Sequence, residues 1–377
     1  MYDLSVTIKV KEVRVINILV LSEDYPSLNN KYAMSYVHSR NLIYKKHFNV
    51  SVLSFKSKVN YSYEGINVMS LNDFEKSEKD YHLLISHAPN VKNHVKFINK
   101  NSKLFRKIIF VIHGHEVLPL NNYYPENYKY NRSFFKKRMQ SIYDKYKLRT
   151  LSKLFNNLFE QNKVKFFFVS SWMKEHFLKN IETYQDKVEN NSEIIFNAAN
   201  EAFISKKYQF DENNYLADFV SIRPLDQPKY GIDLIVKFAE SNSNYTFHIY
   251  GEGSYFDYHA IPDNVKVIKS FIEQKDIPAL LNKYKCALMP TRLDSQGVMV
   301  CEIATYGMPC ITSDIPICRE MLNEFPNVVF IPNSQFGYDN NYNSVLELYN
   351  IKNLPDKFHN NNTVNKEIEK IKNIINS

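Results

Sequence analysis

Short apolar runs of strand length recur along the whole chain, and segments with the length of a helix separate them. In the first half these runs lie at Val13–Ser22, Val50–Phe55, Leu83–Ser86, Ile108–Ile112 and Val164–Val169. Parallel strands that are buried on both faces are continuously apolar, and crossover helices join them. The sequence therefore predicts βαβ units and a parallel sheet, with helices over Tyr32–Lys46 and Trp172–Lys179.

The pattern stops at the polar segment 211–218 (DENNYLAD) and then starts again. Further strands are expected at Phe219–Ile222, Tyr245–Tyr250, Val265–Ile268, Cys286–Met289, Pro309–Thr312 and Val328–Ile331. A chain of 377 residues exceeds one hydrophobic core and suits two domains. We therefore predict an α/β protein with two doubly wound, Rossmann-like domains, residues 1–205 and 206–362, and a break near 205–217. The helix expected within 363–377 is a candidate to pack back on the first domain.

Composition and the N-terminus exclude several classes of protein. Hydrophobic residues make up 44% and charged residues 23%, which is ordinary for a folded protein. No run approaches the ~18 apolar residues of a spanning helix. The run Val15–Leu21 is interrupted by Asn17 and has no signal-peptide cleavage site. We therefore expect a cytoplasmic protein.

The four cysteines give no sign of a metal site. No pair has the C-x-x-C spacing of zinc ligands, and no histidine cluster lies beside them. We expect them to be reduced, buried and small apolar residues of the core. They are Cys286, Cys301, Cys310 and Cys318.

Most of the net charge of +8 lies in one segment, residues 121–153. Nine basic residues stand there against Glu126 and Asp144, a local net of +7, and Tyr and Phe are interleaved with them. Nucleic acid, an anionic membrane face or a phosphorylated substrate would suit such a segment, and a solvated helix face is the plain alternative. The basic residues are Lys129, Arg132, Lys136, Lys137, Arg138, Lys145, Lys147, Arg149 and Lys153.

Two cations follow the first strand of the second domain. Arg223 and Lys229 lie six residues apart in a loop, between the end of that strand and a helix expected from Gly231. A helix N-terminus and cations at the carboxyl end of a strand together make a site for a diphosphate. The alternative is two solvated surface cations.

A second polar loop follows the strand Cys286–Met289. Asp294 lies in it, Gly297 opens a helix, and Glu302 lies within that helix in an apolar run. The N–H groups near Gln296, Gly297 and Val298 form a site for an anion or a hydroxyl. Asp294 either binds a ligand or caps the helix, and Glu302 is either a ligand-binding or a surface carboxylate. A carboxylate in an apolar run needs a partner.

This region resembles the retaining glycosyltransferases of family 4, also called glycosyl transferases group 1, which have the GT-B fold. That family has an acidic residue followed, after seven residues, by Glu, and Asp294 and Glu302 match this spacing. The family also has an Arg and, further on, a Lys-Gly pair. Arg223 and Lys229 are similar to these, although Tyr230 stands between Lys229 and Gly231. Further matches in family order are His113, Ser170-Ser171, Asn197, Gly251 and Gly253, and Ser313 to Glu320. The chain departs from the family at Asp294, where Glu is usual, and in the loop 22–30, which lacks a glycine pair.

The resemblance implies a role for each matched residue. Arg223 and Lys229 would neutralise the diphosphate of a nucleotide sugar, and Glu302 would bind the ribose. Asp294, with main-chain groups of Gln296, Gly297 and Val298, would bind the donor sugar. His113 would contact that sugar near the reacting carbon. The alternative is that His113 has only a structural role and that His115 or Glu116 makes this contact. Gly251, Gly253 and Asn197 would complete the donor site.

The resemblance also implies a reaction. The anomeric configuration would be retained, with no metal and no cofactor, from a donor linked to UDP or GDP. The acceptor would be a glycan, in particular a lipid-linked oligosaccharide of bacterial capsule or O-antigen synthesis. Residues 121–153 would then attach the protein to the anionic inner face of the cell membrane, and no nucleic acid is expected. The alternatives are a catalytically silent partner subunit, a nucleic-acid-binding protein and a sugar-nucleotide epimerase of the same fold.

Overall fold

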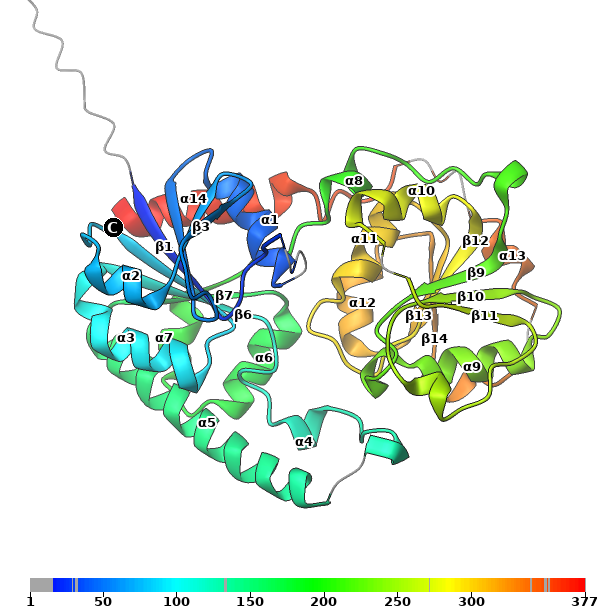
Figure 1. Ribbon diagram of the computed structural model, residues 1–377, viewed down its shortest axis with the longest axis horizontal. Helices are drawn as coiled ribbons and strands as arrows, with labels where there is room; N and C mark the ends of the chain where they lie inside the picture. The colour runs from blue at the N-terminus through cyan, green and yellow to red at the C-terminus, as the bar shows by residue number, and fades with distance from the viewer. Residues whose placement is uncertain are drawn as a thin grey trace, which may run out of the picture.

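The computed structural model describes residues 16–28, 30, 33–131, 134–270, 272–339, 341–348, 351 and 353–376. They form two α/β domains side by side (Figure 1). Among these residues, no helix is both long and apolar enough to cross a membrane. The predicted strand residues Val13–Val15 and the helix residue Tyr32 lie outside the described residues.

The first domain is built on an eight-stranded sheet of order β3-β4-β2-β1-β5-β6-β7-β8. All neighbouring strands pair in parallel except β3 and β4, which are antiparallel. The strands are β1 (Asn17–Ser22), β2 (Asn49–Ser54), β3 (Tyr61–Tyr63), β4 (Ile66–Met69), β5 (Leu83–His87), β6 (Lys107–Ile112), β7 (Val164–Phe168) and β8 (Ser192–Ile194).

The second domain is built on a six-stranded, all-parallel sheet of order β11-β10-β9-β12-β13-β14. Both sheets reverse their strand order beside the first strand, as doubly wound sheets do, and this places a crevice at the carboxyl ends of the strands. The strands are β9 (Ala217–Ile222), β10 (Phe247–Tyr250), β11 (Val265–Ile268), β12 (Tyr284–Met289), β13 (Cys310–Ser313) and β14 (Val328–Ile331).

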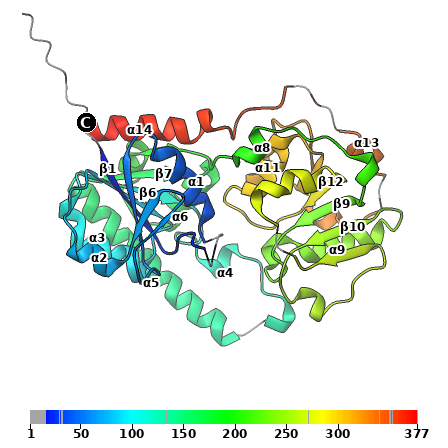
Figure 2. The same cartoon turned by 45° about the horizontal axis from the view of Figure 1, so that its top comes forward.

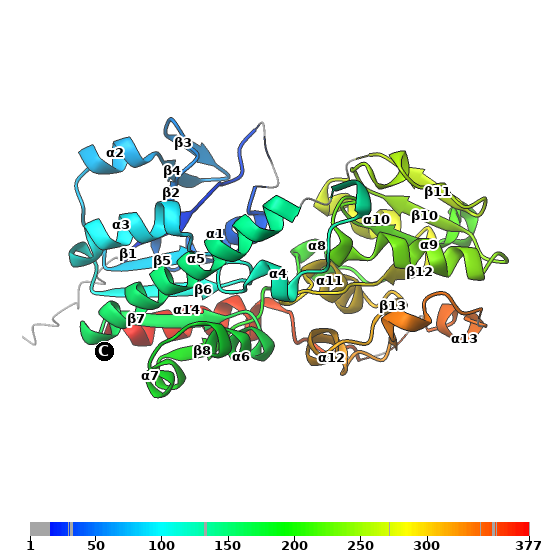
Figure 3. The ribbon, with the colours of Figure 1, turned by 90° about the horizontal axis from the view of Figure 1, so that it is seen from below.

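Helices cover both sheets, and one of them is much longer than the rest. Helix α5 (Phe134–Glu160) runs along the first domain and its N-terminal end reaches toward the second (Figure 3). The others are α1 (Ser35–Tyr44), α2 (Leu71–Lys76), α3 (Lys96–Asn101), α4 (Leu120–Tyr123), α6 (Ser171–Asn180), α7 (Gln185–Asn190), α8 (Glu201–Ile204), α9 (Ile232–Ser241), α10 (Ile277–Leu281), α11 (Val298–Tyr306), α12 (Pro316–Leu322), α13 (Asn343–Leu346) and α14 (Val364–Asn376).

The chain passes from the first core to the second just after β8. Ile195 packs in the first core, whereas Ala199, Phe203 and Tyr208 pack in the second. The segment at which we placed the break, 205–217, therefore starts after Ala199 and Phe203, which already belong to the second core, and itself contains Tyr208 of that core. Its charged residues sit on the surface of that domain rather than between the domains.

The last helix, α14, returns to the first domain (Figures 1 and 2). Val364, Ile368 and Ile371 pack in the first core. Arg40 of α1 and Glu367 of α14 form a buried ion pair, with Nε 3.0 Å from Oε2. Burying both charges is tolerated because each compensates the other, so this pair fixes α14 on α1.

Candidate active site

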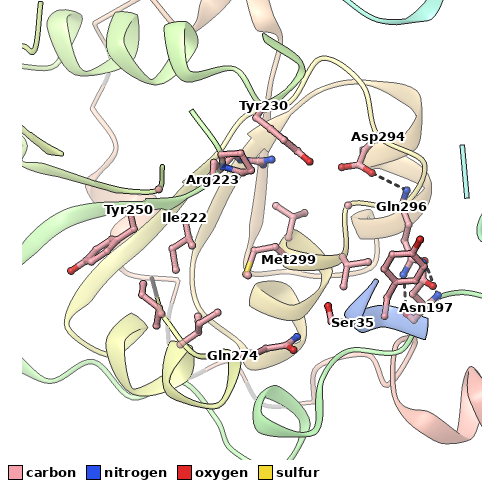
Figure 4. A pocket seen from close by; sticks show the side chains of 18 of the residues that line it. Ser35, Asn197, Ile222, Arg223, Tyr230, Tyr250, Gln274, Asp294, Gln296 and Met299 are labelled. Atoms are coloured by element: carbon pink, nitrogen blue, oxygen red, sulfur yellow. Dashed lines mark hydrogen bonds between the residues drawn. The ribbon is translucent and has the colours of Figure 1, made fainter. Parts of the chain in front are cut away.

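A cavity of about 830 Å³ lies between the two domains. Tyr36 and His113 line it from the first domain. Asn197 lines it from the connection, and Arg223 and Asp294 line it from the second domain (Figure 4). The lining residues of the second domain end or follow the strands β9, β10, β11 and β12, so the cavity lies at the carboxyl ends of that sheet. This is where ligands bind in doubly wound sheets.

Arg223 follows β9 and its side chain is almost completely buried at the cavity. Its Nη2 donates to the carbonyl of Met289 over 2.9 Å, and its Nε has no hydrogen-bond partner among the described residues. Burial lowers the pKa of Arg223, yet a guanidinium stays charged throughout the physiological range. A buried cation with an unpaired donor is costly unless an anion joins it.

Gly251 allows β10 to approach the end of β9. A Cβ at this position would lie 1.8 Å from the carbonyl oxygen of Arg223. The main-chain N–H of Arg223 donates to the carbonyl of Tyr250 over 2.9 Å. Glycine is therefore required here for a close contact that places Arg223. Gly253, also predicted for the site, lies beside Asp226 and does not line the cavity.

Lys229 does not line the cavity and lies beside the ring of Tyr230. Its Nζ is 4.6 Å from the ring centroid of Tyr230 and 5.8 Å from that of Tyr124. The guanidinium carbon of Arg223 is 5.5 Å from the same Tyr230 ring. Two like charges are thus held near one aromatic ring, where cation–π attraction offsets part of their repulsion.

The start of α11 faces the cavity without a capping side chain. Gly297 precedes the helix with φ 75°, a left-handed conformation that glycine adopts without strain, and makes no side-chain cap. The first N–H groups of the helix, at Val298 and Met299, therefore remain for a ligand, and the helix dipole favours an anion there. Both residues line the cavity.

Asp294 does not cap α11, which is one of the two roles that the sequence left open for it. Its Oδ1 accepts from the N–H groups of Ser295 and Gln296 over 2.8 and 3.3 Å, which shapes the turn before α11. It also lines the cavity, on the side where the hydroxyl of Tyr230 points (Figure 4).

Gln296 and Asn197 join the connection to the second domain. Oε1 of Gln296 accepts from N and Nδ2 of Asn197, each over 2.7 Å, and Nε2 of Gln296 donates to the Asn197 carbonyl over 2.9 Å. The remaining Oδ1 of Asn197 is buried and has no partner among the described residues. Since Asn197 lines the cavity, this oxygen is an acceptor for a ligand.

Glu302 is a buried carboxylate, not a surface one. Its Oε1 accepts from the N–H of Asn200 and from Nε2 of Gln274, each over 3.0 Å. Burial raises its pKa to about 7, although these two hydrogen bonds act in the opposite direction. Glu302 lines a second cavity of about 550 Å³, which shares Asn197, Gln274 and Val298 with the first.

His113 is held at both ends of its main chain. Its N–H and that of Gly114 donate to the carboxylate of Glu116, and its carbonyl accepts from the hydroxyl of Ser295 in the second domain. The Tyr36 ring lies 4.7 Å from the imidazole between centroids. Burial lowers the pKa of His113 well below its ordinary value, so the ring is neutral.

The predicted Ser170, Ser171 and Glu320 meet at another contact between the domains. The Ser170 hydroxyl caps α6 by accepting from the N–H of Met173, and it donates to the Ser295 carbonyl over 2.7 Å. The carboxylate of Glu320 accepts from the N–H groups of Ser171 and Trp172 over 2.6 and 2.9 Å. Glu320 thus caps a helix of the opposite domain and does not line the cavity.

A cluster of aromatic rings closes a further contact between the domains. Tyr130, which precedes α5, stacks on Tyr258 of the second domain with centroids 4.2 Å apart and planes at 10°. The hydroxyl of Tyr128 donates to Asp233 over 3.2 Å, and its ring contacts Tyr255. The segment between Tyr124 and α5 is therefore bound to the second domain through Tyr128 and Tyr130.

Sequence reasoning missed several residues of the site. Gln274, Tyr36 and Ser295 line the cavity or hold its walls, yet no spacing signal marks them, because their partners lie far away in the chain. Tyr230 was visible as the residue that separates Lys229 from Gly231. The four cysteines are free and buried, as predicted. Among the described residues, no group of three or more His, Cys, Asp or Glu side chains could hold a metal ion.

Residues 200–364 match the family model described as glycosyl transferases group 1. Over 90 residues the chain is 28% identical to a Klebsiella pneumoniae protein described as an uncharacterized 41.2 kDa protein in cps region. That alignment spans 24% of this chain and 25% of the Klebsiella protein. Over these residues the family match confirms the resemblance to the glycosyl transferases group 1.

Solved structures resemble the whole chain. Anabaena Alr3699/HepE, in complex with UDP and glucose, has a TM-score of 0.65 at 12% identity, covering 96% of this chain and 100% of that one. A mutant of S. aureus TarM in complex with fondaparinux, alpha-GlcNAc-glycerol and UDP has a TM-score of 0.60 at 11% identity, covering 96% of this chain and 100% of that one. WaaG, a glycosyltransferase involved in lipopolysaccharide biosynthesis, has a TM-score of 0.57 at 13% identity, covering 88% of this chain and 90% of that one. These likenesses confirm the predicted fold, which is GT-B.

Proposed function

We infer, from a second domain that matches the glycosyl transferases group 1 and a GT-B fold over the whole chain, that this protein is a glycosyltransferase. It transfers a sugar from a nucleotide-linked donor to a glycan acceptor. The observation that carries the inference is the buried Arg223 with an unpaired Nε, beside the uncapped N-terminus of α11 in one cavity. This pair of features fits a diphosphate.

We assign the parts of the donor to the walls of the two cavities. The diphosphate lies between Arg223 and the N–H groups of Val298 and Met299. Lys229, beside the ring of Tyr230, adds a further positive charge. The ribose hydroxyls donate to Glu302 from the joint between the cavities. The donor sugar then lies between Asp294 and His113, which line the first cavity from different domains.

The proposed chemistry is retaining and independent of metal. The bond between the anomeric carbon and the diphosphate oxygen breaks, and a bond to an acceptor hydroxyl oxygen forms on the same face while that hydroxyl gives up its proton. Negative charge grows on the leaving diphosphate, where Arg223, Lys229 and the α11 dipole stabilise it. These fixed charges supply the stabilisation that a metal ion would otherwise supply.

The proposed acceptor is a lipid-linked oligosaccharide in the synthesis of a bacterial surface polysaccharide, such as a capsule or O-antigen. The cps region named for the Klebsiella relative, and the lipopolysaccharide pathway named for WaaG, support this choice. The UDP in the HepE and TarM structures supports a UDP-linked donor, with GDP as the alternative base.

Helix α5 supports a peripheral position on the cell membrane. Apolar side chains are exposed on it at spacings of three or four residues, with Phe135 72% and Tyr146 58% exposed and Met139 and Ile142 between them. By helical spacing Lys136, Arg138, Lys145, Arg149 and Lys153 lie on or beside this face, whereas Lys137 lies on the opposite side and pairs with Glu126 over 2.9 Å. Exposed rings and apolar chains among cations suit the headgroup region of an anionic leaflet. Lys147 is not part of this face, because it pairs with Asp144 inside the domain.

The transfer reaction is tested with a panel of UDP- and GDP-sugars and bacterial membrane extract as the acceptor source, in the presence of EDTA. We expect one donor to be consumed, with the α or β configuration of the donor conserved in the product by NMR. Arg223→Ala should abolish this transfer, while Arg319→Ala, which changes an arginine outside the cavity, should not. A folded protein that consumes no donor would favour a catalytically silent subunit, and isomerisation without acceptor would favour an epimerase.

Membrane attachment is tested by co-sedimentation with vesicles of phosphatidylcholine, with and without 30% phosphatidylglycerol as a standard anionic mixture of about physiological surface charge. We expect binding to the anionic vesicles only, and its loss on charge reversal of Lys136, Lys137 and Arg138. A matched reversal of three exposed lysines of the second domain, Lys206, Lys207 and Lys266, serves as the control. Equal loss in both triple variants would contradict a specific role for α5.

A further inference from the structure

A second histidine lies directly behind His113. His87 is the last residue of β5 and is completely buried. Its Nδ1 lies 3.1 Å from Nε2 of His113, and the two rings are 5.4 Å apart between centroids with planes at 28°. His87 does not line the cavity, whereas His113 does. Among the described residues, His87 therefore connects to the cavity through the His113 ring.

Both rings are neutral, and one proton lies between them. Burial lowers the pKa of His87 and of His113 well below the ordinary value, and the positive charge of Arg40 acts in the same direction on both. In a neutral pair, one ring nitrogen carries the hydrogen and donates to the lone pair of the other. The hydrogen bond itself does not say which ring is the donor.

The other nitrogen of His87 decides the direction. His87 Nε2 is buried and has no partner among the described residues. If His87 accepted at Nδ1, its proton would be on Nε2 as a buried, unpaired N–H, which is rarer in proteins than an unpaired acceptor. His87 therefore donates from Nδ1, and the lone pair remains on Nε2. His113 then accepts at Nε2 and carries its own proton on Nδ1.

We propose that His87 is a positioning residue for the transfer reaction, which holds the His113 ring in one orientation and keeps its proton on Nδ1. This rests on the proposed function, in which His113 contacts the donor sugar near the reacting carbon. The Nδ1–H of His113 is then a fixed, uncharged donor to a sugar oxygen in the cavity. His113 cannot turn over without losing its bond to His87.

The surroundings of His113 are consistent with this role. The main chain on either side of the ring is already fixed, by Glu116 from its own domain and by Ser295 from the second. The Tyr36 ring restricts the imidazole on one face. Rotation about the side-chain bonds is the freedom that remains, and the bond to His87 removes it. A donor that is oriented before the reaction needs no reorganisation during it.

The tautomer is tested first, without any activity. Long-range ¹H–¹⁵N spectra of the whole protein labelled at histidine report which ring nitrogen is protonated, and His113→Gln identifies the resonances. We expect His113 with the proton on Nδ1 and His87 with the proton on Nδ1. A His113 signal protonated at Nε2 in the wild-type protein would overturn the proposal, whether or not the protein transfers sugars.

The kinetic test compares two substitutions of His87. The amide nitrogen of His87→Asn keeps a donor near the position of Nδ1, while His87→Leu removes it. We expect His87→Leu to lower kcat about 10- to 100-fold with little change in KM for the donor, and His87→Asn to recover most of this loss. Nucleoside diphosphate binding should stay unchanged in both variants.

His94→Leu is the matched control. His94 is equally buried in the same domain and bonds to Ser86 rather than to His113. A loss of kcat in His94→Leu as large as in His87→Leu would show that any cavity in this core impairs the enzyme, and would overturn the proposal. If His87→Leu does not fold, the tautomer of the wild-type protein still decides. Absence of donor binding in the wild-type protein would instead refute the proposed function.

Discussion

The pH dependence of donor binding should follow the ionisation of Glu302. Its Oε1 already accepts from Asn200 and Gln274, so a ribose hydroxyl must use Oε2. A proton on Oε2 removes that acceptor. With a pKa of about 7, about 90% of Glu302 is ionised at pH 8 and about 10% at pH 6. The association constant should therefore fall about tenfold between these values.

The assay is isothermal titration calorimetry with a nucleotide sugar from pH 5.5 to 8.5. A nucleotide sugar is chosen because its diphosphate has no proton to gain in this range, unlike the terminal phosphate of a nucleoside diphosphate. Glu302→Gln should bind more weakly at pH 8, with no dependence on pH. A flat profile for the wild-type protein, or the same slope in Glu302→Gln, would refute the reasoning.

The ionisation of Glu302 should also affect the free energy of unfolding, but in the opposite direction: a rise in pH strengthens donor binding and weakens the fold. The folded pKa of Glu302 lies above the value for an unfolded chain, so folding favours the protonated form. Its contribution is present below about pH 4.5 and is lost as the pH rises through about 7, by roughly 3 kcal/mol. In urea unfolding, the free energy of unfolding of the wild-type protein should therefore fall relative to that of Glu302→Gln as the pH rises. Parallel curves would contradict the raised pKa.

Three further changes should have distinct effects. Gly251→Ala places a Cβ 1.8 Å from a carbonyl oxygen at the end of β9 and should weaken donor binding about 100-fold by calorimetry, whereas Gly337→Ala, whose nearest neighbour is at 4.0 Å, should not. Arg40→Met leaves Glu367 buried without its partner and should lower the free energy of unfolding by about 3–5 kcal/mol in urea; an unchanged midpoint would contradict a role for the pair. Tyr130→Ala removes a stack between the domains and should increase the radius of gyration of the free protein in X-ray scattering; an unchanged radius would contradict a contact that limits opening.

The parallel strands were predictable because their burial makes them continuously apolar. Strands β11 and β14 have the predicted bounds, since polar turns flank both. The hairpin β3–β4 was not predicted, because Tyr61–Tyr63 lies at the sheet edge and is partly exposed. The sequence identified the region of helix α5 only as a basic segment and did not give the bounds of the helix. Its apolar residues point both to the core and to solvent, so they do not form one apolar face.

The candidate site was predictable where a residue follows a strand or opens a helix. Arg223, Asp294 and His113 were found in this way, because the carboxyl ends of parallel strands meet at one edge. Contacts between distant residues carry no such signal. Asn197 and Gln296 lie 99 residues apart, and His87 and His113 come from neighbouring strands without a shared motif. Lys229 shows the limit of spacing alone, since it lies beside the Tyr230 ring and does not line the cavity.

The most direct test of the account is calorimetric binding of nucleoside diphosphates in the absence of metal. The account predicts that one of UDP and GDP binds selectively, that Arg223→Ala abolishes binding, and that the exposed Arg319→Ala binds as the wild-type protein does. Equal binding by Arg223→Ala, or no binding of any nucleotide by the folded wild-type protein, would contradict a donor site between the two domains.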